Sequence, residues 1–185
     1  MRVIAIDPSL SGTGLSLLVA GAAPQWSVDT VKIEISKNPD LARAEFGRME
    51  SISEAVRQWT IDEMDGERLD LAVIESPAYS RSMGKSHERS GLWWMLYGEL
   101  VEFKIPVLVV RPNLRAKYAT GKGTSSKDEV LLAASRRYPD VAMRNNNEAD
   151  AVVLAAMGAR FLGAPVDSLP KANLDAMNTL ISGKG

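Results

Sequence analysis

The stretch Val3-Ile4-Ala5-Ile6-Asp7-Pro8-Ser9-Leu10-Ser11-Gly12-Thr13-Gly14 decides how this chain folds. Residues 3–6 are an apolar run, the pattern of a short strand buried on both faces. Asp7 ends the run, the following proline cannot extend a central ladder, and two glycines allow a turn into a second strand over 15–20. A carboxylate at the end of a central strand predicts a metal or phosphate site. The plainer interpretation is that Asp7 merely begins a turn.

The composition is that of an ordinary globular domain. The 185 residues are 45% hydrophobic and 24% charged, enough for one domain with a substantial core. The absence of cysteine excludes disulfides and thiolate metal sites, and the single histidine, His87, excludes a multi-histidine site. The sequence has neither a membrane-spanning run nor a signal peptide, so we expect no membrane association and a cytoplasmic location.

Positive charge is concentrated in one segment of the chain. Residues 81–127 carry nine Lys and Arg against three acids, a charge of +6, which leaves −7 for the remainder. A basic segment of this kind indicates a polyanionic partner. A solvated basic face is the alternative interpretation.

A second apolar strand repeats the pattern of the first. It covers residues 69–74 and ends in Glu75, which a Ser-Pro turn follows. In an α/β sheet, ligands gather at strand ends near a change in strand order. Two strands that each end in a carboxylate therefore favour a shared cation site. The other elements expected in this half are a third strand over 25–35, a helix that Asn38-Pro39 opens and a strand over 107–110.

The helix expected from about residue 88 to 103 is apolar on nearly all sides, which indicates burial on two faces. One face fits the sheet. The second face, which we predict to meet a second subunit, consists of Trp93, Trp94, Tyr97 and Val101. The alternative is that the chain's own tail covers this tryptophan pair.

The last long helix brings a third acid. Asp150 lies in line with its apolar stripe and Asn147 shares its face, whereas Glu148 is turned about 160–200° away. A buried-face acid needs a partner, although a carboxylate near a helix N-terminus is also favoured by the helix dipole alone. We expect one domain over 1–164 and a tail over 165–185 with one short helix.

Asp7, Glu75 and Asp150 can converge if the two strands are adjacent and the last helix packs beside them. Such an all-oxygen cluster suits Mg²⁺, with Mn²⁺ as a substitute. Two such ions, about 4 Å apart, activate water and stabilise the leaving oxygen of a phosphodiester. The Gly-Lys122-Gly-Thr loop lacks the spacing and the preceding strand of a P-loop, so no nucleotide cofactor is expected.

Together these motifs resemble those of RuvC-type Holliday-junction resolvases, of the ribonuclease H-like superfamily, and particularly the phage-borne branch. The resemblance covers residues 4 to about 162. It rests on four motifs in this order: Ile-Asp7-Pro-Ser-Leu-Ser-Gly-Thr-Gly, Val-Ile-Glu75-Ser-Pro, Arg-Ala-Lys117-Tyr-Ala-Thr-Gly-Lys-Gly with Lys127 ten residues on, and Asn-Glu-Ala-Asp150-Ala.

The resemblance implies a mixed five-stranded sheet flanked by helices, a homodimer, and paired Mg²⁺-dependent nicks across a four-way DNA junction. Asp7, Glu75 and Asp150 would hold the metals, and Lys127 would support the reaction. Tyr79 lies near the position of an aromatic that meets the junction's bases. The residues expected to bind DNA are Tyr79, Arg81, Lys85, Arg111, Arg115, Lys117, Lys122 and Lys127. The setting would be a bacterium or a phage-infected cell.

One position departs from the family pattern, which has an acid three residues before Asp150, where this chain has Asn147. An amide oxygen can ligate a hard cation but brings no charge. We keep Asn147 among the expected catalytic and metal-binding residues. It is either a natural variant or a substitution that traps a complex, or Glu148 compensates for the missing acid. The direction of Glu148 on the helix argues against compensation.

Two other functions compete with a junction nuclease. A catalytically impaired protein would bind junctions without cutting them, and a ribonuclease H-like factor would process ribosomal RNA precursors. An actin-like sugar kinase also begins with a strand, an Asp and a Gly-rich turn, but its two-domain architecture needs a much longer chain.

Overall fold

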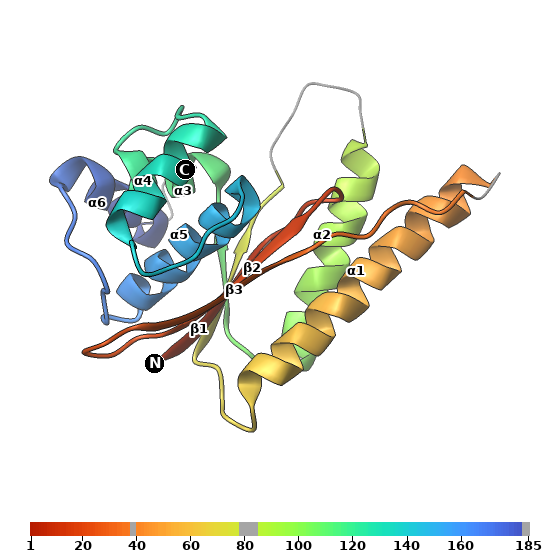
Figure 1. The fold of residues 1–185 in the computed structure, drawn as a ribbon, viewed down its shortest axis with the longest axis horizontal. Helices are drawn as coiled ribbons and strands as arrows, with labels where there is room; N and C mark the ends of the chain where they lie inside the picture. Colours follow the sequence, from red (N-terminus) through yellow and green to blue (C-terminus); the bar gives the residue numbers. More distant parts are fainter. Residues whose placement is uncertain (38–39, 78–84, 183–185) are drawn as a thin grey trace.

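The computed structural model describes residues 1–37, 40–77 and 85–182, which form a sheet covered by helices on both faces (Figure 1). Within these residues no helix has the length and apolar character to cross a membrane. The elements in chain order are β1 (Arg2–Asp7), β2 (Thr13–Val19), β3 (Gln25–Val31), α1 (Leu41–Met64), β4 (Leu71–Glu75), α2 (Ser86–Glu102), β5 (Val107–Val110), α3 (Pro112–Thr120), α4 (Lys127–Arg137), α5 (Asn146–Phe161) and α6 (Lys171–Ile181).

The sheet has the order β3-β2-β1-β4-β5, with β1 at its centre. β1 to β3 form an antiparallel meander, whereas β4 and β5 run parallel to β1. Ile6 pairs with Ile74, so the next residues along the two strands, Asp7 and Glu75, stand side by side at the same edge. The predicted mixed five-stranded sheet flanked by helices is confirmed.

The strand pleat sends alternate side chains into two cores. Ile4 and Ile6 face α1 and α2, whereas Val3 and Ala5 face α5 and the helices around it. Burial on both faces explains why β1 is apolar without alternation. Figure 1 shows the α1 and α2 pair on one side of the sheet and α3 to α6 on the other.

Two glycine contacts bring α5 unusually close to the sheet. A Cβ atom at Gly158 would lie 2.6 Å from Val73 Cγ2, and one at Gly14 would lie 2.0 Å from the carbonyl oxygen of Asn147. Only a residue without a side chain fits at either position. Gly14 therefore sets the first turn of α5 directly against the start of β2.

Two element boundaries differ from the prediction. β3 ends at Val31 rather than residue 35, because its last partner is Thr13, the first residue of β2, beyond which there is no ladder to join. The cap of α1 is Asp40, whose side chain accepts a hydrogen bond from the backbone N–H of Arg43. The predicted cap, Asn38, lies outside the described residues.

The second face of α2 is divided between the core and the surface. Trp93 is buried, whereas Trp94 is 64% exposed and Val101 53% exposed. The described tail is not their cover: α6 packs on α3, where Asn173 Nδ2 donates a hydrogen bond to the carbonyl oxygen of Tyr118 over 2.8 Å. The alternative interpretation, in which the tail covers the tryptophan pair, is therefore wrong for the described tail.

Candidate active site

Three carboxylates from three elements meet at one edge of the sheet. Asp7 ends β1, Glu75 ends β4, and Asp150 lies in the second turn of α5, which contacts both strands. All three are buried, with exposed fractions of 8% or less. Such burial is costly for a charged carboxylate unless a cation or a hydrogen-bond donor compensates for it.

The compensating cation inside this cluster is Arg115 of α3. Its Nε donates to Glu75 Oε2 over 2.5 Å, and its Nη1 donates to Asp150 Oδ1. The Nη2 atom lies 3.5 Å from Glu75 Oε1, so the guanidinium faces both oxygens of that carboxylate. Arg115 was expected to bind DNA. Instead, its side chain is 6% exposed and lies between two of the acids.

One oxygen on each of two carboxylates lacks a hydrogen-bond partner. These buried atoms are Asp7 Oδ2 and Asp150 Oδ2. Lys127 Nζ lies 3.7 Å from Asp150 Oδ2, within ion-pair distance but beyond a hydrogen bond. Burial and the neighbouring charges of Glu75 and Asp150 raise the pKa of Asp7 well above its usual range. Burial likewise raises the pKa of Asp150 to about 6, although Arg115 opposes this.

Asn147 lies one turn before Asp150 on the same helix but does not line the cleft beside the carboxylates. Its amide nitrogen is 2.9 Å from where a Cβ atom of Gly12 would stand. Asn147 thus packs on the turn that links Asp7 to β2. An amide here offers an oxygen to a hard cation without adding charge.

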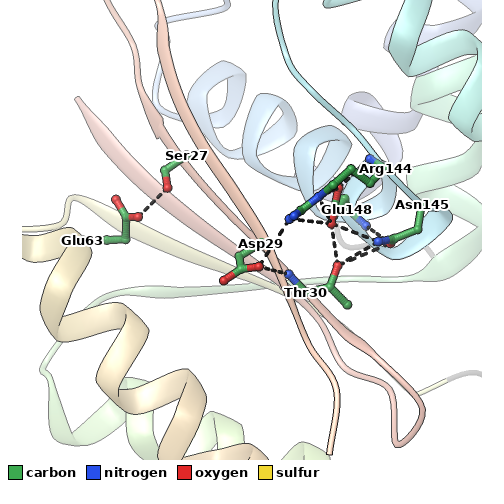
Figure 2. Close-up of polar contacts among 7 residues, drawn as sticks. All are labelled: Ser27, Asp29, Thr30, Glu63, Arg144, Asn145 and Glu148. Atoms are coloured by element: carbon green, nitrogen blue, oxygen red, sulfur yellow. Dashed lines mark hydrogen bonds and ion pairs between the residues drawn. The ribbon is translucent and has the colours of Figure 1, made fainter.

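Glu148 belongs to a different cluster, as Figure 2 shows. It is buried and accepts hydrogen bonds from Thr30 Oγ1 over 2.8 Å, from the Arg144 backbone N–H over 2.6 Å and from Asn145 Nδ2 over 2.9 Å. Burial alone would raise the pKa of Glu148, but the hydrogen bonds from Arg144 and Thr30 outweigh it and lower this pKa below its usual value. The hydrogen bonds to its oxygens join the start of α5 to β3. This agrees with the prediction that Glu148 points away from Asp150.

A cleft of about 360 Å³ opens beside the carboxylates. The indole Nε1 of Trp93 donates to the carbonyl oxygen of Glu75 over 2.9 Å, which ties α2 to the end of β4. Arg89 also lines the cleft, although nothing in its neighbouring sequence distinguishes it from other basic residues and it was not predicted to belong to the site. The cleft is lined by Asp7, Pro8, Ser9, Glu75, Ser76, Pro77, Arg89, Trp93, Pro112, Arg115 and Lys127.

Of the other described basic residues expected to bind DNA, Lys127 lines the cleft, whereas Lys85, Arg111, Lys117 and Lys122 do not. Lys127 begins α4 and is more than half exposed, Arg111 caps α3, and Lys117 lies near the end of α3. Lys122 is exposed in the loop between α3 and α4. Lys85 Nζ donates to Glu45 Oε1 over 2.7 Å and is thereby held to α1. Tyr79 and Arg81 lie outside the described residues.

The three carboxylates are ligands of the kind that a hard divalent cation prefers. The guanidinium of Arg115, itself a cation, already lies among them. Across residues 1–37, 40–77 and 85–182, no three acidic or histidine side chains are grouped so that they could hold one metal ion together. Arg115 separates Glu75 from Asp150. The unpartnered oxygens of Asp7 and Asp150, in contrast, are acceptors that lack a positive partner at hydrogen-bond distance. Metal ligation by Asp7, Glu75, Asp150 and Asn147 thus requires the Arg115 side chain to move.

Solved structures of junction resolvases share this fold, although the sequence matches no protein-family model and no curated protein. RuvC of Thermus thermophilus superposes with a TM-score of 0.66 at 17% identity, over 89% of this chain and 98% of that one. The fowlpox virus resolvase with its Holliday junction gives 0.53 at 11% identity, over 88% and 99%. The yeast mitochondrial resolvase Ydc2 gives 0.52 at 13% identity, over 98% and 80%. At these identities the likeness establishes the RuvC-type, ribonuclease H-like fold.

Proposed function

We propose that this chain is a Mg²⁺-dependent endodeoxyribonuclease of the phage-borne RuvC type. It would resolve four-way DNA junctions, and other branched DNA, by paired nicks. The observation that carries the proposal is the cluster of Asp7, Glu75 and Asp150 beside a cleft. This cluster sits in a fold shared with resolvases over almost their whole length. Two of those resolvases, from Thermus thermophilus and fowlpox virus, have been solved with Holliday junction DNA.

Each group at the site has a chemical role in this proposal. Two Mg²⁺ or Mn²⁺ ions held by the three acids and Asn147 would supply an activated water and stabilise the leaving oxygen. Lys127, beside Asp150 at the rim, is placed to neutralise charge that builds on the phosphate. The burial of the three acids reduces the screening of these charges by bulk water.

A gel assay on a synthetic four-way junction tests the function directly. The purified protein is expected to nick the junction at symmetric positions with Mg²⁺ and to bind it without cutting in a chelator. Linear duplex DNA and a branched RNA serve as substrate controls. Because Asn147 lowers the negative charge of the site, binding without any Mg²⁺- or Mn²⁺-dependent nicking would indicate a catalytically impaired junction-binding protein.

Lys117→Ala and Lys127→Ala are expected to weaken junction binding and to flatten its dependence on salt, because each removes a cation that neutralises phosphate. The slope of log K against log [salt] should become less steep by about 1 for each lost contact. Fluorescence anisotropy over a salt series measures it. Lys127→Ala should also slow nicking at saturating protein, whereas Lys117→Ala should not. Unchanged slopes in both variants would place the DNA path elsewhere.

The exposed half of α2 supports the proposed homodimer. Trp94 packs edge-on against Trp93 and Tyr97, with ring centroids 4.8 and 5.8 Å away, yet most of its surface is uncovered. Trp94→Glu is expected to give monomers, because it puts a charge into an apolar interface. Sedimentation velocity measures the change, with Trp94→Phe as the matched apolar control. A wild-type protein that sediments as a monomer would contradict the dimer and, with it, the paired nicks.

A further inference from the structure

Arg115 occupies the position from which a cation would reach two of the three acids. Its guanidinium contacts Glu75 through two nitrogens and Asp150 through a third. A guanidinium is always charged and matches a carboxylate geometrically, so these contacts are strong. The chain thereby supplies its own counter-ion to the cluster.

The charges of the cluster explain why an internal cation is needed. When all three buried carboxylates are ionised they carry three negative charges, against one positive charge from Arg115 and one from the more exposed Lys127. A divalent cation that uses the oxygens of Glu75, or Oδ1 of Asp150, needs the same acceptor atoms that Arg115 holds, whereas Oδ2 of Asp150 is left without a hydrogen-bond partner. Arg115 and such a cation therefore exclude each other from these oxygens.

Buried contacts with the tail hold α3, the helix that carries Arg115, in place. Asp167 of the tail accepts hydrogen bonds from the hydroxyls of Tyr118, over 3.0 Å, and Tyr138, over 2.6 Å, and pairs with Arg160. Because Tyr118 is on α3, this buried cluster fixes the helix backbone. Exchange of the guanidinium for a metal ion thus requires side-chain rotation, and the cleft that Arg115 lines gives it room.

We infer that Arg115 is a displaceable internal counter-ion that competes with divalent metal for Glu75 and Asp150. It holds the acids together in the metal-free chain and turns into the cleft when a cation takes its place. This inference rests on the metal site of the proposed function. The added claim is that Arg115, which does not itself bind the metal, determines the affinity of the site for divalent cations.

Metal titration without DNA tests the competition. Isothermal calorimetry with Mn²⁺ is expected to show Arg115→Gln binding at least tenfold more tightly than wild type, since the competitor is gone. Arg136→Gln, with the same loss of charge on the exposed side of α4, is the matched control and should bind like wild type. Binding by Arg115→Gln that equals or falls below that of wild type would overturn the inference.

A measurement on the wild-type protein covers the case in which Arg115→Gln does not fold. The Arg115 Nε–H group, bonded to Glu75, should give a slowly exchanging NMR signal in the metal-free protein. Saturating Mg²⁺ is expected to shift this signal and to speed its exchange. The Nε–H of Arg160, which donates to Tyr118 Oη over 3.1 Å behind the site, should not change.

The outcomes separate this inference from the proposed function. An Arg115 signal that stays unchanged in saturating Mg²⁺ overturns the inference, while Mg²⁺-dependent nicking by the same sample would leave the nuclease intact. If neither wild type nor Arg115→Gln binds Mn²⁺ and no nicking occurs, both fail.

Discussion

Asp7→Asn abolishes nicking and leaves junction binding intact or tighter, and Glu75→Gln does the same. Each change removes a carboxylate proposed to hold metal, together with a negative charge that would repel phosphate. We expect nicking to fall at least a hundredfold, which corresponds to about 2.7 kcal/mol in the barrier. Single-turnover assays on a four-way junction measure it, with Asp140→Asn on an exposed turn as control. If both variants still nick the junction, the active site does not lie at this edge of the sheet.

Asp7→Asn is also expected to change the thermal stability of the metal-free protein. Because burial and nearby acids raise the pKa of Asp7, ionisation of Asp7 costs stability as the pH rises through its raised pKa. Asparagine does not ionise. We therefore expect Asp7→Asn to increase the melting temperature at pH 8 relative to wild type, and the gain to shrink towards pH 4. Thermal unfolding in a chelator measures it, and a lower melting temperature at pH 8 would contradict the environment described for Asp7.

Asn147→Asp lowers the magnesium concentration for half-maximal nicking and raises the rate. The substitution adds a charged ligand beside Asp150 with almost no change in volume. A rate increase of about tenfold needs only about 1.4 kcal/mol. A magnesium titration of the nicking rate on the four-way junction measures both effects.

Glu148→Gln is the matched control for Asn147→Asp, because it alters the next residue of the same helix. Glu148 accepts hydrogen bonds from Thr30, Arg144 and Asn145, so the loss of its charge should cost about 1–3 kcal/mol of stability. The magnesium requirement should stay that of wild type. If Asn147→Asp changes nothing and Glu148→Gln stops nicking in folded protein, Glu148 is the ligand.

The strands and the acids at their ends could be predicted because they depend on local pattern. The apolar runs before Asp7 and Glu75 determine burial on two faces, and the turn residues after them determine where each strand stops. The three-residue spacing of Asn147 and Asp150 gave their shared helix face. None of these inferences needs knowledge of distant contacts.

The features that could not be predicted depend on tertiary contacts. Arg115 resembles any surface arginine until α3 docks beside Glu75 and Asp150, so the sequence gives no sign of its central place. The difference in burial between Trp93 and Trp94 depends on how α2 is rotated against the sheet. The end of β3 is determined by where its partner strand begins.

The carboxylates at positions 7, 75 and 150 have a consequence for synthesis on the ribosome. β1 and β4 emerge long before α5, whose residues cover the sheet face of Val3 and Ala5. Until α5 has left the exit tunnel, that apolar face lacks its cover and the third acid is missing. A nascent chain that exposes β1 to α4 can therefore neither complete its core nor assemble the three acids of the proposed site. In the proposed nuclease, cleavage would therefore have to wait until α5 emerges, which would keep unfinished chains harmless to nearby DNA.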